Sequence, residues 1–198
     1  MLNNLNKYTI VLASNSPRRK ELLKGLGIKF VVKAMKDIDE TYPSSLTGED
    51  IPIYISKKKA YGCINNINNN ELIITADTIV YLRDAKGGGE VLGKPYDKIE
   101  AINMLKKLSG KTHEVITGVC ILTKEKCSVF SATSKVSFDV LKEEDILHYV
   151  DFYKPYDKAG AYGIQEWIGF IGVDGLNGSY YNVMGLPVQR LYKELQKF

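Results

Sequence analysis

The feature that most constrains the fold of this chain is a short polar segment, Leu12 to Arg19, which lies between two apolar stretches. An apolar run over 9–12 precedes it, and leucines at helical spacing follow it, which predicts a strand, a tight loop and a helix. Ser16 suits the cap of that helix, and Pro17 its first residue, because the missing proline N–H would have no partner there. A second apolar run, 28–32, predicts another strand. This order of elements indicates an α/β fold.

Two arginines, Arg18 and Arg19, stand at the start of the predicted helix. A helix N-terminus presents unpaired N–H groups and a partial positive charge, which normally favours carboxylates. Cations here oppose the helix dipole, and they make sense if an anion such as a polyphosphate binds the N–H groups and the guanidinium groups together. A solvated basic turn is the alternative interpretation, and this segment alone does not decide between the two.

The composition narrows the possible partners. The 198 residues can bury a core, and the net charge of +4 suits an anionic ligand. The chain lacks the basic stripe with interleaved aromatic residues that is typical of nucleic-acid binders, so a nucleic acid polymer is not an expected partner. We find no leader and no apolar stretch of membrane-spanning length, and we therefore expect a cytoplasmic protein that does not enter the membrane.

The supply of metal ligands is equally restricted. Two histidines, His113 and His148, are too few for a multi-histidine site, and the three cysteines lack metal-ligand spacing, so we expect buried or inert thiols. A bound metal would be held by carboxylates and phosphate oxygens, which suits Mg²⁺ or Mn²⁺. The histidines also lack a serine or cysteine nucleophile signature, and the chain has no P-loop.

The rest of the sequence predicts one continuous domain over 1–198, with no linker and no internal repeat. The predicted elements alternate between helices and strands, and they suggest two lobes that flank a cleft. They are a helix over 53–64, a buried strand over 72–76 with further apolar residues over 79–82, a strand over 91–95, a helix over 101–108 capped by Asp97 and Glu100, a hairpin of 112–122 with 128–138, a helix over 143–150 and a terminal helix after Pro187.

Asp77 is the strongest single candidate for a chemical role. The pattern places it at the carboxyl end of a buried strand, where ligands bind in α/β sheets. A carboxylate there could bind a divalent metal, take a proton from water, or do both. The alternative, an aspartate that caps a turn, is more frequent for a single residue of this kind. Asp39 and Glu40 form a second acidic point that could share a metal with Asp77.

Two lysines complete this set of charges. Lys94 lies in a Gly-Lys-Pro turn that allows close approach of a ligand, whereas Lys59 belongs to a lysine run that usually indicates a solvated helix face. Arginines at a helix start, two separate acidic points and lysines near turns are together the groups that clamp a Mg²⁺-polyphosphate.

A later segment, 159–165, combines small residues with a terminal amide, Gln165. An amide both donates and accepts hydrogen bonds, so it suits recognition of a base edge. A packed loop in which glycines satisfy the backbone angles is the alternative, and it is the more frequent one. Trp167 could stack on a base, although most such aromatic residues belong to the core or its rim.

These motifs, taken together, resemble the Maf proteins, which are nucleoside triphosphate pyrophosphatases related in fold to the inosine triphosphate pyrophosphatases. The resemblance covers almost the whole chain, and several blocks in the same order are more specific than any single one. The blocks are residues 14–23, 37–40, 59–60, 76–80, 92–95, 108–113, 158–165 and 182–187.

The resemblance implies an elongated, twisted mixed β-sheet flanked by helices, with two lobes around a central cleft. It also implies a cytoplasmic homodimer that cleaves nucleoside triphosphates between the α and β phosphates with a divalent metal. Site roles carry over by motif, and they form the following set: Asp77 as proton acceptor, Glu40 and Asp77 as metal ligands, Ser14, Arg18, Arg19, Lys59 and Lys94 as phosphate contacts, and Arg18, Thr78 and Gln165 as the positions typical of the subgroup acting on dTTP and UTP.

The chain departs from the family pattern at several places. Glu166, Trp167 and Ile168 follow Gln165 where the family usually has small residues, and the loop before Tyr180 differs. These departures could reshape the base pocket, so a pyrophosphatase for modified purines such as 7-methyl-GTP stays open. A nucleotide-binding regulator of cell division is the alternative outside the enzymes, and competent residues at every candidate position argue against it.

Overall fold

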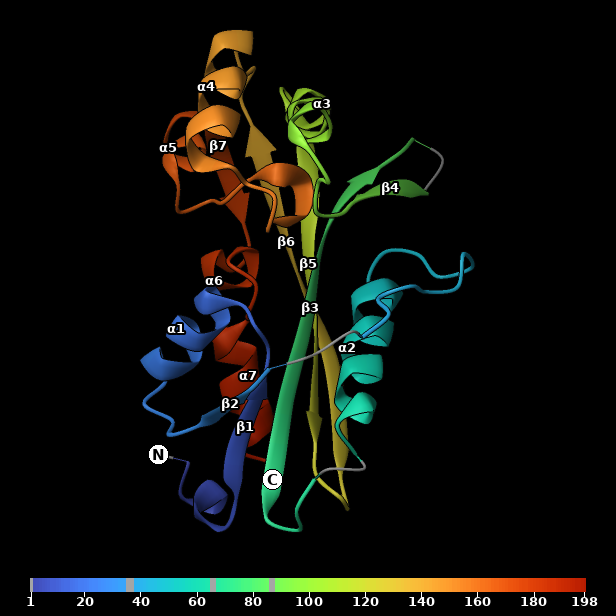
Figure 1. Cartoon of the computed structure of the whole chain (residues 1–198), viewed down its shortest axis with the longest axis vertical. Helices are drawn as coiled ribbons and strands as arrows, with labels where there is room; N and C mark the ends of the chain where they lie inside the picture. Colours follow the sequence, from blue (N-terminus) through green and yellow to red (C-terminus); the bar gives the residue numbers. More distant parts are fainter. Residues whose placement is uncertain (1, 35–37, 65–66, 86–87) are drawn as a thin grey trace. The chain divides into compact units, whose positions relative to one another are not determined.

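The structure is a computed structural model, and it describes residues 2–34, 38–64, 67–85 and 88–198 (Figure 1). The described residues form a seven-stranded sheet in the order β2-β1-β3-β5-β6-β7, with β4 paired to β3. The strands are β1 (Thr9–Ala13), β2 (Val31–Lys33), β3 (Glu71–Arg83), β4 (Gly89–Leu92), β5 (Thr112–Leu122), β6 (Cys127–Phe138) and β7 (Val173–Asn177). β1 is parallel to β2 and β3, whereas β4 is antiparallel to β3 and β7 to β6. The sheet is therefore mixed, as expected.

Helices lie between these strands in the chain, which confirms the α/β class. They are α1 (Pro17–Gly25), α2 (Asp50–Gly62), α3 (Lys98–Leu108), α4 (Glu143–Tyr153), α5 (Trp167–Gly172), α6 (Tyr180–Val183) and α7 (Val188–Leu195), with 3₁₀ turns η1 (Asn3–Lys7) and η3 (Ala159–Ala161). None of the helices within the described ranges is long and apolar enough to cross a membrane.

The chain divides into two compact units. The first contains residues 1–77, 117–132 and 185–198, and the second contains 78–116 and 133–184. Three long strands, β3, β5 and β6, contribute residues to both units. Each unit has its own helices.

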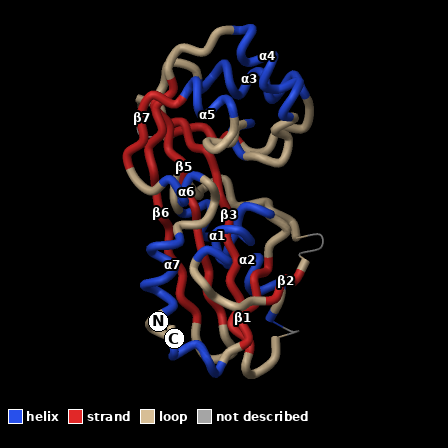
Figure 2. Tube along the Cα trace, turned by 90° about the vertical axis from the view of Figure 1, so that its left-hand side faces the viewer, coloured by secondary structure: helices blue, strands red, loops and turns tan. Residues whose placement is uncertain are grey.

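In the first unit, helices cover both faces of the strands. Val129 of β6 packs with Ala60 of α2 and Cys120 of β5, whereas its neighbour Ser128 donates a hydrogen bond to Glu194 of α7. Successive side chains of a strand point to opposite faces, so α2 and α7 lie on opposite sides of the sheet. Figures 1 and 2 show the same arrangement, with α1 on the side of α7.

The start of α2 packs directly against β5. A Cβ atom added to Gly118 would lie 2.3 Å from the carbonyl carbon of Pro52, so only glycine fits beneath this turn. The helix begins at Asp50, three residues before the predicted start at residue 53. Pro52 is tolerated in the first helical turn, where its missing N–H has no intrahelical partner to lose.

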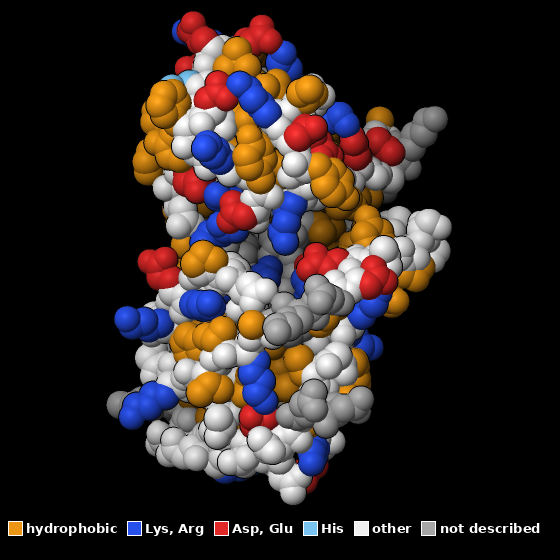
Figure 3. Space-filling model, in the orientation of Figure 1, with side chains coloured by type: hydrophobic (Ala, Val, Ile, Leu, Met, Phe, Trp, Pro, Cys, Tyr) orange, Lys and Arg blue, Asp and Glu red, His pale blue; other side chains and the backbone are white. Residues whose placement is uncertain are grey.

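The second unit has an apolar core of its own. Its helix α3 begins with the predicted capping box, in which Glu100 N–H donates to Asp97 at 2.8 Å and Tyr96 N–H donates to Glu100 at 2.7 Å. The core joins β-strand residues to α3, α4 and α5, and its members include Val80, Leu105, Leu108, Val115, Val136, Ile146, Tyr149, Tyr162, Ile164 and Ile168. Apolar side chains also reach the surface over α3, α4 and α5 (Figure 3), and Phe152 and Phe170 are the most exposed ones on α4 and α5.

The predicted break in the third strand is wrong. The runs 72–76 and 79–82 belong to one continuous strand, β3, and Asp77 lies in its middle instead of at its end. The parallel pairing with β1 ends at Leu12 and Ile74, so Asp77 lies beyond the carboxyl end of β1 although β3 continues. An aspartate is tolerated inside this strand because a lysine pairs with its carboxylate.

The segment 156–185 contains more regular structure than the sequence predicted, namely α5, β7 and α6. Each of these elements has at most six residues, which is too short for a periodic apolar pattern. Of the thiols expected to be buried or inert, Cys120 is buried, Cys63 is half-buried and Cys127 is exposed.

Candidate functional site

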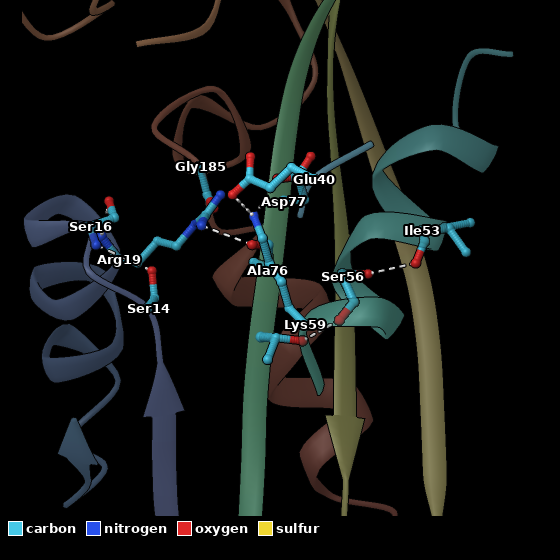
Figure 4. A network of polar contacts seen from close by, with 11 residues as sticks. Ser14, Ser16, Arg19, Glu40, Ile53, Ser56, Lys59, Ala76, Asp77 and Gly185 are labelled. Atoms are coloured by element: carbon cyan, nitrogen blue, oxygen red, sulfur yellow. Dashed lines mark hydrogen bonds and ion pairs between the residues drawn. The ribbon is translucent and has the colours of Figure 1, made fainter. Parts of the chain in front are cut away.

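The centre of the candidate site is the ammonium group of Lys59, which contacts two carboxylates (Figure 4). Its Nζ atom lies 2.7 Å from Asp77 Oδ1 and 2.8 Å from Glu40 Oε1. Lys59 and Asp77 are buried, whereas the side chain of Glu40 is 48% exposed. Removing one partner from a buried ion pair typically costs about 3–5 kcal/mol, so these groups depend on one another. The lysine run therefore does not form only a solvated helix face.

A buried hydrogen bond sets the position of Lys59 relative to Asp77. Thr75 Oγ1 of β3 donates to the Ser56 carbonyl of α2 at 2.7 Å, and both residues are fully buried. Thr75 and Asp77 share one face of the strand, and Ser56 and Lys59 are one turn apart on the helix. The same contact between α2 and β3 therefore brings the ammonium to the carboxylate.

The acidic loop is held by the neighbouring lysine. Lys58 Nζ donates to Asp39 Oδ2 at 2.9 Å, and the Thr41 hydroxyl and N–H donate to the same carboxylate. These hydrogen bonds, the Thr41 hydroxyl first, hold the pKa of Asp39 well below its usual range. Asp39 thus anchors the loop, and Glu40 alone of the two reaches the ammonium beside Asp77. Asp37, in the same sequence block, lies outside the described residues.

The loop after β1 forms the predicted helix start. Ser16 Oγ accepts the Arg19 N–H at 3.4 Å and caps α1, and Ser14 Oγ accepts the Ser16 N–H at 3.2 Å. The side chain of Arg19 crosses to β3 and to the segment before α7. It donates to the carbonyl oxygens of Ala76 and Gly185, each at 2.8 Å. Arg19 therefore braces three segments of the first unit.

The arginines and the acidic residues share one electrostatic environment. Burial lowers the pKa of Arg19, the nearby charges of Asp77 and Glu40 oppose that shift, and Arg18 adds to it. Arg18, Arg19 and Lys59 thus lie close enough to Asp77 and Glu40 to share one electrostatic environment. Several cations grouped in this way suit an anionic ligand.

The other predicted site residues belong to the second unit. Lys94 is exposed after β4, Thr78 follows Asp77 in β3 and is half-buried, and Gln165 is half-buried in a turn before α5.

Sequence reasoning assigned no role to a second polar network, around Glu166. Its carboxylate contacts Lys158 Nζ at 3.0 Å and accepts a hydrogen bond from the Tyr149 hydroxyl. The only sequence signal was the departure from the family pattern after Gln165. His113, in the same unit, contacts the Tyr162 hydroxyl at 2.7 Å, and burial lowers its pKa to about 4.

The carboxylates of the site limit how a metal could be held. Within the described ranges, no group of three or more His, Cys, Asp or Glu side chains converges on one point. Two carboxylates, Glu40 and Asp77, do converge on one cation, the Lys59 ammonium. Mg²⁺ is typically held by one or two carboxylates together with substrate phosphates, so these residues fit a divalent ion that arrives with its nucleotide.

Comparison with known proteins connects this site to a family. A "dTTP/UTP pyrophosphatase" of Phocaeicola vulgatus is 60% identical over 197 residues, which covers both chains fully, and one of Parabacteroides distasonis is 57% identical over 198 residues with the same coverage. A HAM1 protein structure from Coxiella burnetii matches with a TM-score of 0.51 and 16% identity, over 96% of this chain and 100% of that one, which supports the fold alone. The family model described as Maf-like protein matches residues 9–198. The chain therefore belongs to the Maf-like proteins, as its motifs indicated.

Proposed function

We propose that this protein is a nucleoside triphosphate pyrophosphatase that hydrolyses the bond between the α and β phosphates of dTTP, UTP or related non-ordinary nucleotides. The products would be a nucleoside monophosphate and pyrophosphate. The observation that carries this proposal is the convergence of Glu40 and Asp77 on Lys59, beside two arginines. The names of the relatives support the same activity.

The cations of the first unit hold the phosphates in this proposal. Arg18 and the N-terminal N–H groups of α1 supply the positive charge that a polyphosphate requires. Ser14 shapes the loop that precedes them. Arg19 already donates to two carbonyl groups, so its contribution combines bracing with charge. Lys94 of the second unit is the further phosphate contact that the motif implies.

Asp77 accepts the proton of the attacking water in the proposed mechanism. The water oxygen attacks the α-phosphorus, the bond to the bridging oxygen breaks, and pyrophosphate leaves with that oxygen. Lys59 holds the Asp77 carboxylate in place and balances its charge. A divalent ion, Mg²⁺ or Mn²⁺, held by Glu40 and Asp77 would supply charge neutralisation at the phosphate oxygens. A general base of this kind contributes about 10²–10⁴-fold to the rate.

Base selection is assigned to Arg18, Thr78 and Gln165, which match the positions of the subgroup acting on dTTP and UTP. Gln165 is the member suited to read a base edge, because its amide both donates and accepts. It is half-buried, as a side chain that meets a ligand at the surface of a protein should be.

The test is a panel of dTTP, UTP, CTP, GTP, ITP and 7-methyl-GTP with Mg²⁺, with Mn²⁺ and with a chelator. We expect pyrophosphate from dTTP and UTP, no orthophosphate, and no turnover with the chelator. Release of orthophosphate would contradict cleavage at the α-phosphorus. Preference for 7-methyl-GTP or ITP would favour the purine alternative, and nucleotide binding without turnover under either metal would favour a regulator.

A homodimer in the cytoplasm, acting as a housecleaning enzyme, belongs to the same proposal. Light scattering of the purified protein at several concentrations measures the oligomeric state, and twice the chain mass of 22.2 kDa is the expected result. A species of single-chain mass at micromolar concentration would contradict the dimer without affecting the proposed reaction.

A further inference from the structure

Gln165 lies in a turn, and two separate hydrogen-bonded links connect the ends of this turn, Gly163 and Glu166. Glu166 N–H donates to the Gly163 carbonyl at 3.0 Å, which closes the turn through the main chain. The second link runs through side chains: Gly163 N–H donates to the Tyr149 hydroxyl at 3.1 Å, and that hydroxyl donates to the Glu166 carboxylate. A closed ring of hydrogen bonds therefore surrounds the residues between Gly163 and Glu166.

Two glycines bring this ring into tight contact with its surroundings. A Cβ atom added to Gly163 would lie 2.9 Å from Glu166 Cδ, so the carboxylate is seated against the turn. A Cβ atom added to Gly169 would lie 2.0 Å from the Ile164 carbonyl oxygen, so α5 starts directly on the turn. Gly169 N–H also donates to the Glu166 carbonyl at 2.8 Å. The turn cannot shift without moving α5.

The carboxylate of the ring is half-buried and lies beside a buried lysine. Lys158, which is buried, places its Nζ atom 3.0 Å from Glu166 Oε1 and 2.7 Å from Asp157 Oδ1. Burial and the adjacent Glu166 raise the pKa of Tyr149, so its hydroxyl stays protonated and donates. Burying a lysine beside carboxylates seldom stabilises a fold more than apolar packing would, which points to a role in fixing geometry.

The turn presents one polar side chain. Ile164 is buried in the apolar core, whereas Gln165 is half-buried. In the part of the chain that the structure describes, no hydrogen bond to the Gln165 amide is found. Its oxygen and nitrogen are thus available to a ligand while its backbone is held by the ring.

An amide can match two different pyrimidines. In one orientation it donates to the carbonyl and accepts from the N–H of the uracil or thymine edge, and turned over it accepts from the amino group and donates to the ring nitrogen of cytosine. The amide turns over by rotation about its last side-chain bond, and this rotation is limited only when the side chain is held close against the base. A turn that moves would let the amide take either orientation, whereas a fixed turn keeps it close to the base and limits the rotation. Discrimination between these bases therefore depends on how firmly the turn is held.

We propose that Glu166, acting through Tyr149 and Lys158, is a positioning residue that orients Gln165 and so sets the preference for uracil or thymine over cytosine. The proposal rests on the proposed function, in which Gln165 reads the base edge. Glu166 touches neither the phosphates nor the water in this view, so its loss affects binding of the base and not the chemical step.

The test compares E166A, E166Q, Y149F, Q165A and the double variant Q165A/E166A with the native protein on UTP and CTP. We expect E166A to raise KM for UTP about tenfold, to change kcat less than about twofold and to lower the UTP-to-CTP ratio of kcat/KM about tenfold. E166Q and Y149F each keep part of the ring and should give about a threefold loss in that ratio. The double variant should be no less selective than Q165A, because both changes remove the same contact.

Matched controls separate this role from a general loss of structure. E143A removes a glutamate of the same unit that pairs with Lys106 on the surface, and it should leave both the ratio and KM unchanged. Circular dichroism and thermal unfolding show which variants are folded. If E166A does not fold, Y149F and E166Q decide the outcome. Y149F retains the aromatic side chain at position 149, and E166Q retains a side chain that can form hydrogen bonds.

A binding assay separates failure of this inference from failure of the proposed activity. Calorimetry with the α,β-methylene analogues of UTP and CTP reports base preference without hydrolysis. If Q165A loses that preference but E166A, E166Q and Y149F keep it, the positioning role of Glu166 is overturned and the pyrophosphatase proposal stands. If Q165A keeps the preference, base reading by Gln165 fails, and the role of Glu166 fails with it. Absence of pyrophosphate release, with the preference still dependent on Glu166, overturns only the activity.

Discussion

Each unit of the molecule contains a buried lysine that contacts two carboxylates. In the first unit Lys59 lies 2.8 Å from Glu40 and 2.7 Å from Asp77, and in the second Lys158 lies 2.7 Å from Asp157 and 3.0 Å from Glu166. The local ion-pair geometry is nearly the same. The surroundings differ, because one cluster stands beside further cations and the other is closed by a tyrosine hydroxyl.

This difference indicates that ion-pair geometry alone does not identify an active site. The Lys59 cluster draws its members from a loop, a helix and a strand, and the charges of two arginines act on the same site. The Lys158 cluster draws its charged members from positions 157–166, and its hydrogen bonds return to the backbone of the same segment. We therefore assign chemistry to the first cluster and positioning to the second.

The largest expected effect comes from removing the carboxylate charge in the first cluster. D77N should lower pyrophosphate release from UTP about a thousandfold, because the amide cannot accept the proton of water. The fold should persist, since Lys59 keeps its contact with Glu40. Steady-state kinetics and near-ultraviolet circular dichroism measure the two properties.

The second cluster supplies the matched control for this change. D157N makes the same substitution beside Lys158, and it should change kcat less than about twofold. Near-normal turnover by D77N, or an equal loss in both variants, would remove the distinction between the two clusters.

The two lysines allow stability and catalysis to be separated. K59M and K158M each leave carboxylates without their buried cation, so each should lower the free energy of unfolding by about 3 kcal/mol. K59M should also lower kcat about a hundredfold, whereas K158M should act mainly on KM. Urea unfolding and steady-state kinetics measure these effects, and a similar drop of kcat in both variants would contradict the assignment.

Most of the fold and part of the site were predictable from the sequence. The capped start of α1, the capping box of α3 and the β5–β6 hairpin each follow from residues close together in the chain. The family blocks named Glu40, Lys59 and Asp77, but no local pattern shows that these three meet. That contact depends on the seating of α2 on β3 through Thr75, which is a tertiary interaction.

Other features escaped prediction for physical reasons that can be stated. The apolar pattern pauses at Asp77 and Thr78, so the strand was expected to end there, yet an ion pair with Lys59 lets it continue. Glu166 resembles an ordinary surface glutamate in the sequence. Its enclosure depends on Tyr149 from another helix and on the absence of a side chain at Gly163.

The second unit also contains a buried histidine, and acid titration of stability should detect it. His113 of the second unit is neutral when buried, and its pKa falls from 6.5 to about 4. The unfolded chain binds the proton first as the pH drops, so this contribution to stability is complete above pH 6.5 and is lost as the pH falls to about 4. The loss amounts to roughly 3 kcal/mol at 1.36 kcal/mol per pKa unit.

Urea unfolding at several pH values measures this slope. H113Q keeps a polar partner for Tyr162 and cannot titrate, so its stability should fall less between pH 6.5 and 4 than that of the native protein. Identical slopes in the two proteins would show that His113 is not the titrating group.

The smallest expected effect concerns how one helix ends in each unit. α1 is followed by Gly27 at a φ of +70°, whereas α4 is followed by Lys154 at a φ of +46°. A left-handed backbone favours glycine, so K154G should raise the free energy of unfolding by about 0.5–1 kcal/mol. G27A should lower it by about 1 kcal/mol, and this loss is purely one of backbone strain because a Cβ atom at Gly27 has nothing within 4 Å.

Thermal unfolding should show opposite shifts of about 2 °C, with kcat unchanged in both variants because neither residue contacts the Lys59 cluster. Shifts in the same direction would mean that the side chain of Lys154, and not its backbone, decides the stability of that helix end.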